Sequence, residues 1–228
     1  MNETILSIIA LVPALVVAIV FHEVAHGYVA KLLGDPTASE RGRLSLNPIR
    51  HVDPVGTLLV PGALALLGGP IFGWAKPVPV NGRRLNNPRR DMMLVGAAGP
   101  ASNLLLAGIG AILLGLLFGY AGLSTEQFQS SLTVMMLQYF LLINVFLAMF
   151  NLLPIPPFDG SHIVEGLLPR SAAEGYAKFR QYGMFLFILL IAITWAFPNS
   201  GVIENVVWPP VEWMLNHYYR LADWVAAR

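Results

Sequence analysis

The sequence predicts an all-α polytopic membrane protein with about four transmembrane helices and one re-entrant or β-like membrane-associated loop. Of its 228 residues, 56% are hydrophobic and only 12% are charged, whereas soluble domains usually carry about 25% charged residues. Several apolar runs are long enough to cross about 30 Å of hydrocarbon as helices. One soluble core cannot hide this much apolar surface, so we expect the molecule to lie in a lipid bilayer.

Four apolar runs are the predicted transmembrane helices, at residues 5–33, 92–120, 132–153 and 181–197. The first run lacks the basic region that begins a signal peptide and continues directly into charged residues. We therefore expect it to be retained as a span. The chain contains no cysteine, which excludes disulfides and thiolate metal sites.

A fifth apolar stretch, residues 57–74, is shorter and is interrupted by prolines and glycines. A short, broken segment is tolerated at membrane depth where it is buried against protein. We therefore expect a re-entrant loop here, although the sequence alone leaves a crossing open.

Basic residues occur after the first span, before the second, and between the third and fourth. They are Lys31, Arg41, Arg43, Arg50, Lys76, Arg83, Arg84, Arg89, Arg90, Arg170, Lys178 and Arg180. If residues 57–74 do not cross, all of these fall on one side, which the positive-inside rule makes cytoplasmic. We expect a multi-pass protein of a cell membrane, of the prokaryotic cytoplasmic type, with both termini outside. The net charge of +1 gives no indication of nucleic-acid binding.

The C-terminal segment, residues 203–224, is rich in tryptophan and tyrosine. That composition favours an interfacial segment, and extra packing on the helix bundle is an equal alternative. No internal repeat divides the chain, so residues 1–228 are predicted to form one integral-membrane domain.

His22 and His26 begin and end a His-Glu-x-x-His motif in the first predicted span. On a helix, residues four apart project from one face about 6 Å apart, so both imidazoles can bind one Zn²⁺. Glu23 lies beside that face, where it can polarise water rather than bind the metal. Ionisable residues inside spans are costly and usually functional. A packing role explains one such histidine better than it explains three ionisable residues together.

Asp159 is the predicted third metal ligand. It follows a proline-rich stretch at the end of the third span, in Asn151-Leu-Leu-Pro-Ile-Pro-Pro-Phe-Asp159-Gly160. The alternative is that Asp159 only caps a helix beginning near Gly160. The first and third spans run in the same direction, so Asp159 and the histidines lie at similar depth near the cytoplasmic side. This shared depth favours the ligand role.

These motifs together resemble the site-2 protease family of intramembrane zinc metalloproteases. The resemblance rests on HEVAH, on NLLPIPPFDG, on GPASN in the second span, and on LNPIRHVDPVGT and GWAKPVPVN between them. It covers about residues 10–170. The chain resembles the compact branch, without PDZ or CBS domains.

The resemblance implies His22, His26 and Asp159 as ligands of one Zn²⁺, with Glu23 as the general base. Asn151 matches a family asparagine that contacts substrate or the developing oxyanion. The implied activity is metalloendopeptidase hydrolysis of transmembrane proteins, in regulated intramembrane proteolysis. Family substrates include anti-sigma factors, pro-sigma factors, remnant signal peptides and transcription-factor precursors, and nothing in this sequence selects among them or gives an oligomeric state.

The segment GWAKPVPVN has the extended character expected of proline-rich chain. Trp74, Lys76, Pro77 and Val78 are therefore predicted to bind substrate by β-addition, with a structural surface loop as an equal alternative. Asn103 is predicted first as a helix–helix hydrogen bond and second as a substrate contact.

The remaining histidines are weaker candidates. His51 is expected to be a solvated loop residue, with a position over the active site as the alternative, and His162 could face the metal. His217 is expected to be interfacial.

A metal transporter or sensor using the same three ligands is the main rival function, and a scaffold that binds helices without cutting them is a weaker one. A transporter does not need Glu23 as a general base.

Overall fold

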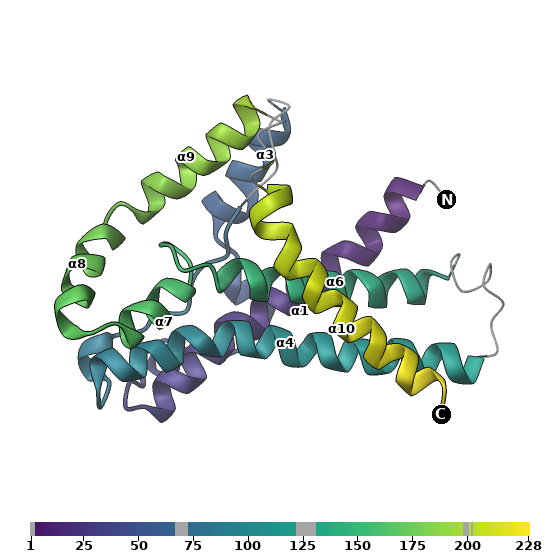
Figure 1. The fold of residues 1–228 in the computed structure, drawn as a ribbon, viewed down its shortest axis with the longest axis horizontal. Coiled ribbons are helices and arrows are strands. Elements are labelled where there is room, and N and C mark those ends of the chain that lie inside the picture. The colour runs from purple at the N-terminus through teal and green to yellow at the C-terminus, as the bar shows by residue number, and fades with distance from the viewer. Residues whose placement is uncertain (1–2, 67–72, 122–130, 198–200, 202) are drawn as a thin grey trace.

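A computed structural model describes residues 3–66, 73–121, 131–197, 201 and 203–228 (Figure 1). These residues form helices and connecting segments, and no strand occurs among them. The all-α prediction is therefore confirmed, and the predicted loop contains no β-ladder within the described ranges.

Three long helices form the bundle: α1 (Glu3–Leu32), α4 (Pro88–Ala121) and α6 (Leu132–Asn151). Each is long and apolar enough to cross a membrane. The first and third run in the same direction and α4 runs back between them, so the C-terminal ends of α1 and α6 lie near the N-terminal half of α4 (Figure 1). Small residues such as Ala107 and Ala111 let α4 pack closely against its neighbours.

The fourth predicted span, residues 181–197, corresponds to the helix α9 (Gly183–Ala196). It follows α8 (Arg170–Arg180), and the two helices are bent by 59° at the break between them. The 14 residues of α9 extend only about 21 Å, which is shorter than a hydrocarbon core. The bent pair together is long and apolar enough for a span, so a fourth crossing stays a prediction.

The predicted re-entrant segment is helical in its first part. A π-helix, η2 (Pro54–Leu59), continues into α3 (Val60–Leu66), and residues 67–72 lie outside the described part of the chain. Residues 73–81 then return without regular secondary structure toward the short 3₁₀ helix η3 (Gly82–Arg84). A second 3₁₀ helix, η1 (Pro48–His51), and the short α2 (Thr37–Glu40) fold the chain after α1.

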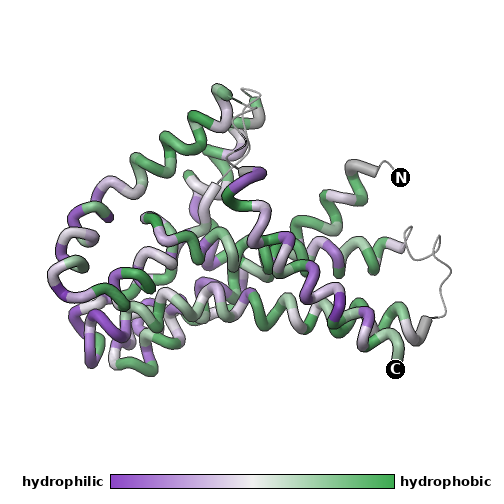
Figure 2. The backbone as a smooth tube through the Cα atoms, viewed as in Figure 1, coloured by the Kyte–Doolittle hydropathy of each residue, from purple (hydrophilic) through white to green (hydrophobic). Residues whose placement is uncertain are grey.

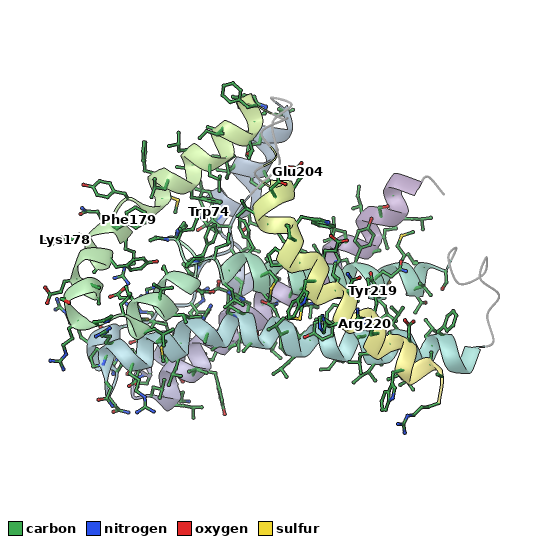
Figure 3. All side chains as sticks on the ribbon, in the orientation of Figure 1. Trp74, Lys178, Phe179, Glu204, Tyr219 and Arg220 are labelled. Atoms are coloured by element: carbon green, nitrogen blue, oxygen red, sulfur yellow. The ribbon has the colours of Figure 1, made fainter. Side chains whose placement is uncertain are left out.

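The C-terminal helix α10 (Trp208–Ala226), preceded by η5 (Ile203–Val207), packs on α4 and α6. Val211, Leu215 and Ala222 are buried in this contact, and the Tyr218 hydroxyl donates to the Leu104 carbonyl at 2.7 Å. Of the two alternatives for residues 203–224, packing on the bundle is observed. Tyr219 and Arg220 lie on the outer side of α10 (Figure 3).

Hydrophilic residues gather at one end of the bundle, where α1 ends, α4 begins, and α7 (Gly160–Leu167) and α8 lie (Figure 2). The basic residues that follow α1 and precede α4 belong to this end. The connecting segments at this end are therefore hydrophilic.

Candidate metal centre

His22 and His26 lie on one face of α1, buried against α4, and their rings meet edge to face with centroids 4.6 Å apart. Their Nε2 atoms are 3.0 Å apart. Residues four apart lie on one face of an α-helix, so this spacing brings two imidazole nitrogens to one point.

The other ring nitrogen of each histidine has a carbonyl partner. Nδ1 of His22 lies 2.7 Å from Oδ1 of Asn103, and Nδ1 of His26 lies 2.6 Å from the Val95 carbonyl. A carbonyl oxygen can only accept, so each Nδ1 carries the proton and donates it. In the neutral rings, both Nε2 atoms then present lone pairs, which is the form that binds a metal.

Asp159 brings a carboxylate oxygen to the same point. Its Oδ2 is 3.0 Å from Nε2 of His22 and 3.3 Å from Nε2 of His26. Asp159 does occupy the N-cap position of α7, yet its side chain makes no capping hydrogen bond. The side chain is directed to the histidines instead of to the helix that follows it.

These three side chains form the one metal-ligand group of at least three His, Cys, Asp or Glu side chains found among the described residues, with all ligand atoms within 4.8 Å of one another. Three lone-pair atoms converge there, and the buried Oδ2 of Asp159 has no hydrogen-bond donor. Such an arrangement is repulsive without a cation, and two histidines with one carboxylate are a ligand set of catalytic zinc. The residues present fit zinc.

Gly99 of α4 forms the wall behind the imidazoles. A Cβ at this position would lie 2.4 Å from Nε2 of His26 and 2.6 Å from Nε2 of His22. Only a hydrogen atom fits at this position, so glycine in the GPASN motif avoids a clash with the two ligand nitrogens.

Glu23 has its own partner on the segment that follows α3. The Val78 backbone N–H donates to Oε2 of Glu23 at 2.7 Å. Val78 lies between Pro77 and Pro79, which have no N–H, so it is the single backbone donor of residues 77–79. Its side chain is buried against α1, where a Cβ on Gly27 would meet it at 2.6 Å.

Further contacts hold the same segment in place. Trp74 packs on Gly56 and lies over the middle of the molecule (Figure 3). The Lys76 N–H donates to the His51 carbonyl at 2.8 Å, and Arg43 donates to the Lys76 carbonyl at 2.7 Å. Residues 74–78 are thus fixed beside Glu23 by backbone contacts.

Asp35 anchors the far end of this segment. Its fully buried carboxylate accepts from the Thr37 N–H and hydroxyl and from the Asn81 N–H at 2.6 Å. Burial alone would raise the pKa of Asp35. The hydrogen bonds from Thr37 and Asn81 and the charge of Arg84 together outweigh burial, so the pKa of Asp35 lies below its ordinary value. Ionised Asp35 therefore ties the end of α1 to residue 81.

Asn103 makes the helix–helix hydrogen bonds that were its first predicted role, rather than the substrate contact that was its second. It is fully buried, with Oδ1 toward His22 and Nδ2 donating to the Ala18 carbonyl and to Oδ1 of Asn144. No polar atom is left for a substrate. Asn144 of α6, also fully buried, was missed by sequence reasoning, and a lone asparagine inside an apolar span was the signal that could have found it.

The remaining candidates are placed as follows. Asn151, the last residue of α6, donates its amide to the Leu147 carbonyl at 2.9 Å. His51 is 3% exposed and lies 2.7 Å from the Ser45 carbonyl, so the expectation of a solvated residue was wrong, because this loop folds back on its own carbonyl groups. His162 bonds to Arg180 at 3.1 Å and is not part of the metal-ligand group. His217 is exposed on α10.

Comparison with known proteins adds an independent finding. Residues 10–193 match the profile of Peptidase family M50. The chain is 42% identical over 200 residues to YwhC of Bacillus subtilis, whose name assigns it to the zinc metalloproteases, with 84% of this chain and 86% of that protein covered. It is 32% identical over 188 residues to Rip2 of Mycolicibacterium smegmatis, with 82% of this chain and 67% of that protein covered. Rip2 of Mycobacterium tuberculosis is 31% identical over 207 residues. The comparison with solved structures gives no match.

Proposed function

Because the chain belongs to Peptidase family M50, and is thus a membrane-bound zinc metalloprotease, we propose that it hydrolyses peptide bonds of transmembrane proteins within or near the bilayer. The proposed process is regulated intramembrane proteolysis. The whole chain acts as one integral-membrane domain, and its substrate is another membrane-spanning protein.

One observation carries the proposal. His22, His26 and Asp159 meet at the ends of apolar helices, with a carboxylate, Glu23, one residue from the first ligand. A peptidase site that lies within transmembrane helices, rather than on a soluble domain, acts on polypeptide that enters the bilayer.

The side chains have distinct roles in this mechanism. A bound zinc ion supplies Lewis acidity, which lowers the pKa of water and polarises a carbonyl. Glu23 takes the proton of the attacking water and returns it to the leaving amine. The Val78 N–H on Oε2 orients this carboxylate, so we assign the proton to Oε1. His22, His26 and Asp159 would hold the metal, and Asn103 and the Val95 carbonyl keep the two imidazole rings in the required tautomer.

Asn151 is the proposed donor to the developing oxyanion. An amide has two N–H groups, and one of them is donated to Leu147 within α6. The second is the group proposed to meet the substrate.

Residues 74–78 are the proposed substrate-binding segment. A helix hides its carbonyl groups, so the substrate must present an extended stretch before it can be cut. The N–H of Val78 is engaged by Glu23 and both neighbouring residues are prolines. A substrate strand at residues 77–79 would therefore pair with carbonyl groups of this segment rather than with its N–H groups.

The proposed topology puts both termini outside and the metal site near the cytoplasmic face. The basic residues at the end of α1, the start of α4 and in α8 support this orientation.

The test is cleavage of a single-span protein by the detergent-purified enzyme, with bound zinc measured in each sample. We expect wild type to cut, and Glu23→Gln to retain zinc while losing at least about 10²-fold in rate, because the general base is gone. Glu174→Gln, an exposed change on α8, is the matched control and should cut normally. Zinc bound by wild type without cleavage of any membrane substrate would favour the transporter, and Glu23→Gln would then leave metal transport intact.

A further inference from the structure

A pocket with cationic residues in its lining lies beside residues 76–79, outside the metal centre. It has a volume of about 350 Å³ and is lined by Arg41, Arg43, Lys76, Pro77 and Pro79. Three of its five lining residues are cations, and none of them belongs to the metal-ligand group. Lys76 lies in the proposed substrate-binding segment, and Arg43 donates to the Lys76 carbonyl.

The local chain conformation builds this pocket. Gly42 has φ +61, a left-handed conformation that favours glycine, and the chain turns there between Arg41 and Arg43. Arg50 donates to the Gly42 carbonyl at 2.7 Å, which fixes the turn. Arg43 then reaches the Lys76 carbonyl, so two loops distant in sequence form one wall.

The cations of the pocket form no ion pair among the described residues, and the acidic residue that interacts with Arg41 is Glu40, which pairs with Arg84. Nε of Arg43 is buried without a hydrogen-bond partner. The nearby acidic residues are engaged elsewhere, since Glu40 pairs with Arg84 and Asp35 binds Thr37 and Asn81. A guanidinium N–H that is buried without an acceptor is destabilising, and an anion bound beside it would supply an acceptor.

Pro77 and Pro79 line the pocket, whereas the side chain of Val78 is buried against α1. Lys76 belongs both to the pocket lining and to the proposed substrate-binding segment. The experiment therefore has to distinguish a lipid from an acidic peptide.

The surroundings of the pocket fit a lipid. Leu46 and Ile49, in the loop that follows Arg43, are 57% and 77% exposed. Cations beside exposed apolar residues, at the end of a transmembrane helix, are typical of a site at the membrane surface, where phosphate headgroups lie. We propose that this pocket binds the phosphate headgroup of an anionic phospholipid, with Arg43 and Lys76 as donors and Arg41 at the rim.

The test is native mass spectrometry of the full-length protein, released from nanodiscs of phosphatidylglycerol and phosphatidylcholine. Wild type should retain phosphatidylglycerol preferentially. The double variant R41Q/K76Q should lose about 25-fold of this preference, because each cation near a lipid surface contributes about fivefold. R83Q/K178Q, which removes two exposed cations that do not line the pocket, should stay within about twofold of wild type.

The outcomes are distinguishable. Equal zinc content and thermal midpoints in all variants would show that folding is intact, and R41Q alone is the milder variant if K76Q disturbs the segment. Equal retention of the two lipids by wild type, or unchanged preference in R41Q/K76Q, would overturn the proposal. Complete displacement of the lipid by excess inorganic phosphate would assign the site to a free anion, and displacement by an acidic peptide would assign it to substrate. None of these readouts depends on proteolysis, so the proposed function can fail while this site stands.

Discussion

At the scale of single residues, the metal centre depends on what surrounds its ligands. The spacing of His22 and His26 and the position of Asp159 could be inferred from the sequence, because a helix repeat and a shared depth bring them together. The hydrogen bond between Asn103 and Asn144 could not be predicted from the sequence, because the rotation of each helix about its axis decides which polar groups meet. The burial of His51 was missed for the same kind of reason, because loop conformation has no periodic pattern.

Gly99→Ala should displace the histidine rings, because the new methyl would overlap both Nε2 atoms. We expect at least about a tenfold loss of zinc affinity, measured by competition with a chelator. Gly62→Ala is the matched control, since nothing lies within 4 Å of a Cβ there. Normal zinc affinity in Gly99→Ala would contradict the position of the metal.

Asn103→Ala should weaken zinc binding about 10- to 100-fold and destabilise the bundle, because Nδ1 of His22 loses its acceptor and the bonds that α4 makes to the Ala18 carbonyl and to Oδ1 of Asn144 are lost. Zinc affinity and the thermal midpoint would be measured together. The control is Asn205→Ala, whose amide donates to the nearby Gly201 carbonyl. If Asn103→Ala binds zinc as wild type does, His22 does not depend on this amide.

At the scale of elements, the long helices were predictable and the connections were not. Uninterrupted apolar runs gave α1, α4 and α6 to within a few residues at most ends. The break between α8 and α9 falls at residues 181–182, where neither residue is a proline or glycine. Packing of the surrounding chain decides such a bend, so the sequence pattern placed α9 within residues 181–197 but did not predict its angle to α8.

Asp35→Asn should loosen the segment 73–81 and lower the thermal midpoint at neutral pH by several degrees. The pKa of Asp35 is lowered in the folded state, so its contribution is full above the unfolded value of about 4 and is lost as pH falls through the lowered value. The difference between variant and wild type should therefore shrink below about pH 4, followed by thermal unfolding. Glu40→Gln, an exposed partner of Arg84, should change little at any pH. A pH-independent difference for Asp35→Asn would contradict the role of its charge.

At the scale of the whole molecule, charge sets orientation and packing sets shape. The basic residues between the predicted spans could be read from the sequence, and hydrophilic residues gather at the end of the bundle where α1 ends and α4 begins (Figure 2). The docking of α10 along α4 could only be stated as one of two alternatives, because an amphipathic aromatic helix suits a membrane surface and a helix bundle equally well.

The topology is testable by single-cysteine labelling, since the chain has no cysteine of its own. In intact cells, a membrane-impermeant maleimide should label Ala227→Cys, and should label Arg83→Cys only after permeabilisation. Both positions are exposed, so access depends on the side of the membrane. The reverse pattern would invert the proposed orientation.

Asn103 joins three helices with one amide group, because α4 carries it and its partners belong to α1 and α6. Metal occupancy and correct assembly of the bundle are therefore linked. During extraction into detergent, molecules whose helices have separated should release their zinc even though every ligand is intact. The zinc-to-protein ratio can thus serve as a quality measure for each purified batch, before any substrate is known.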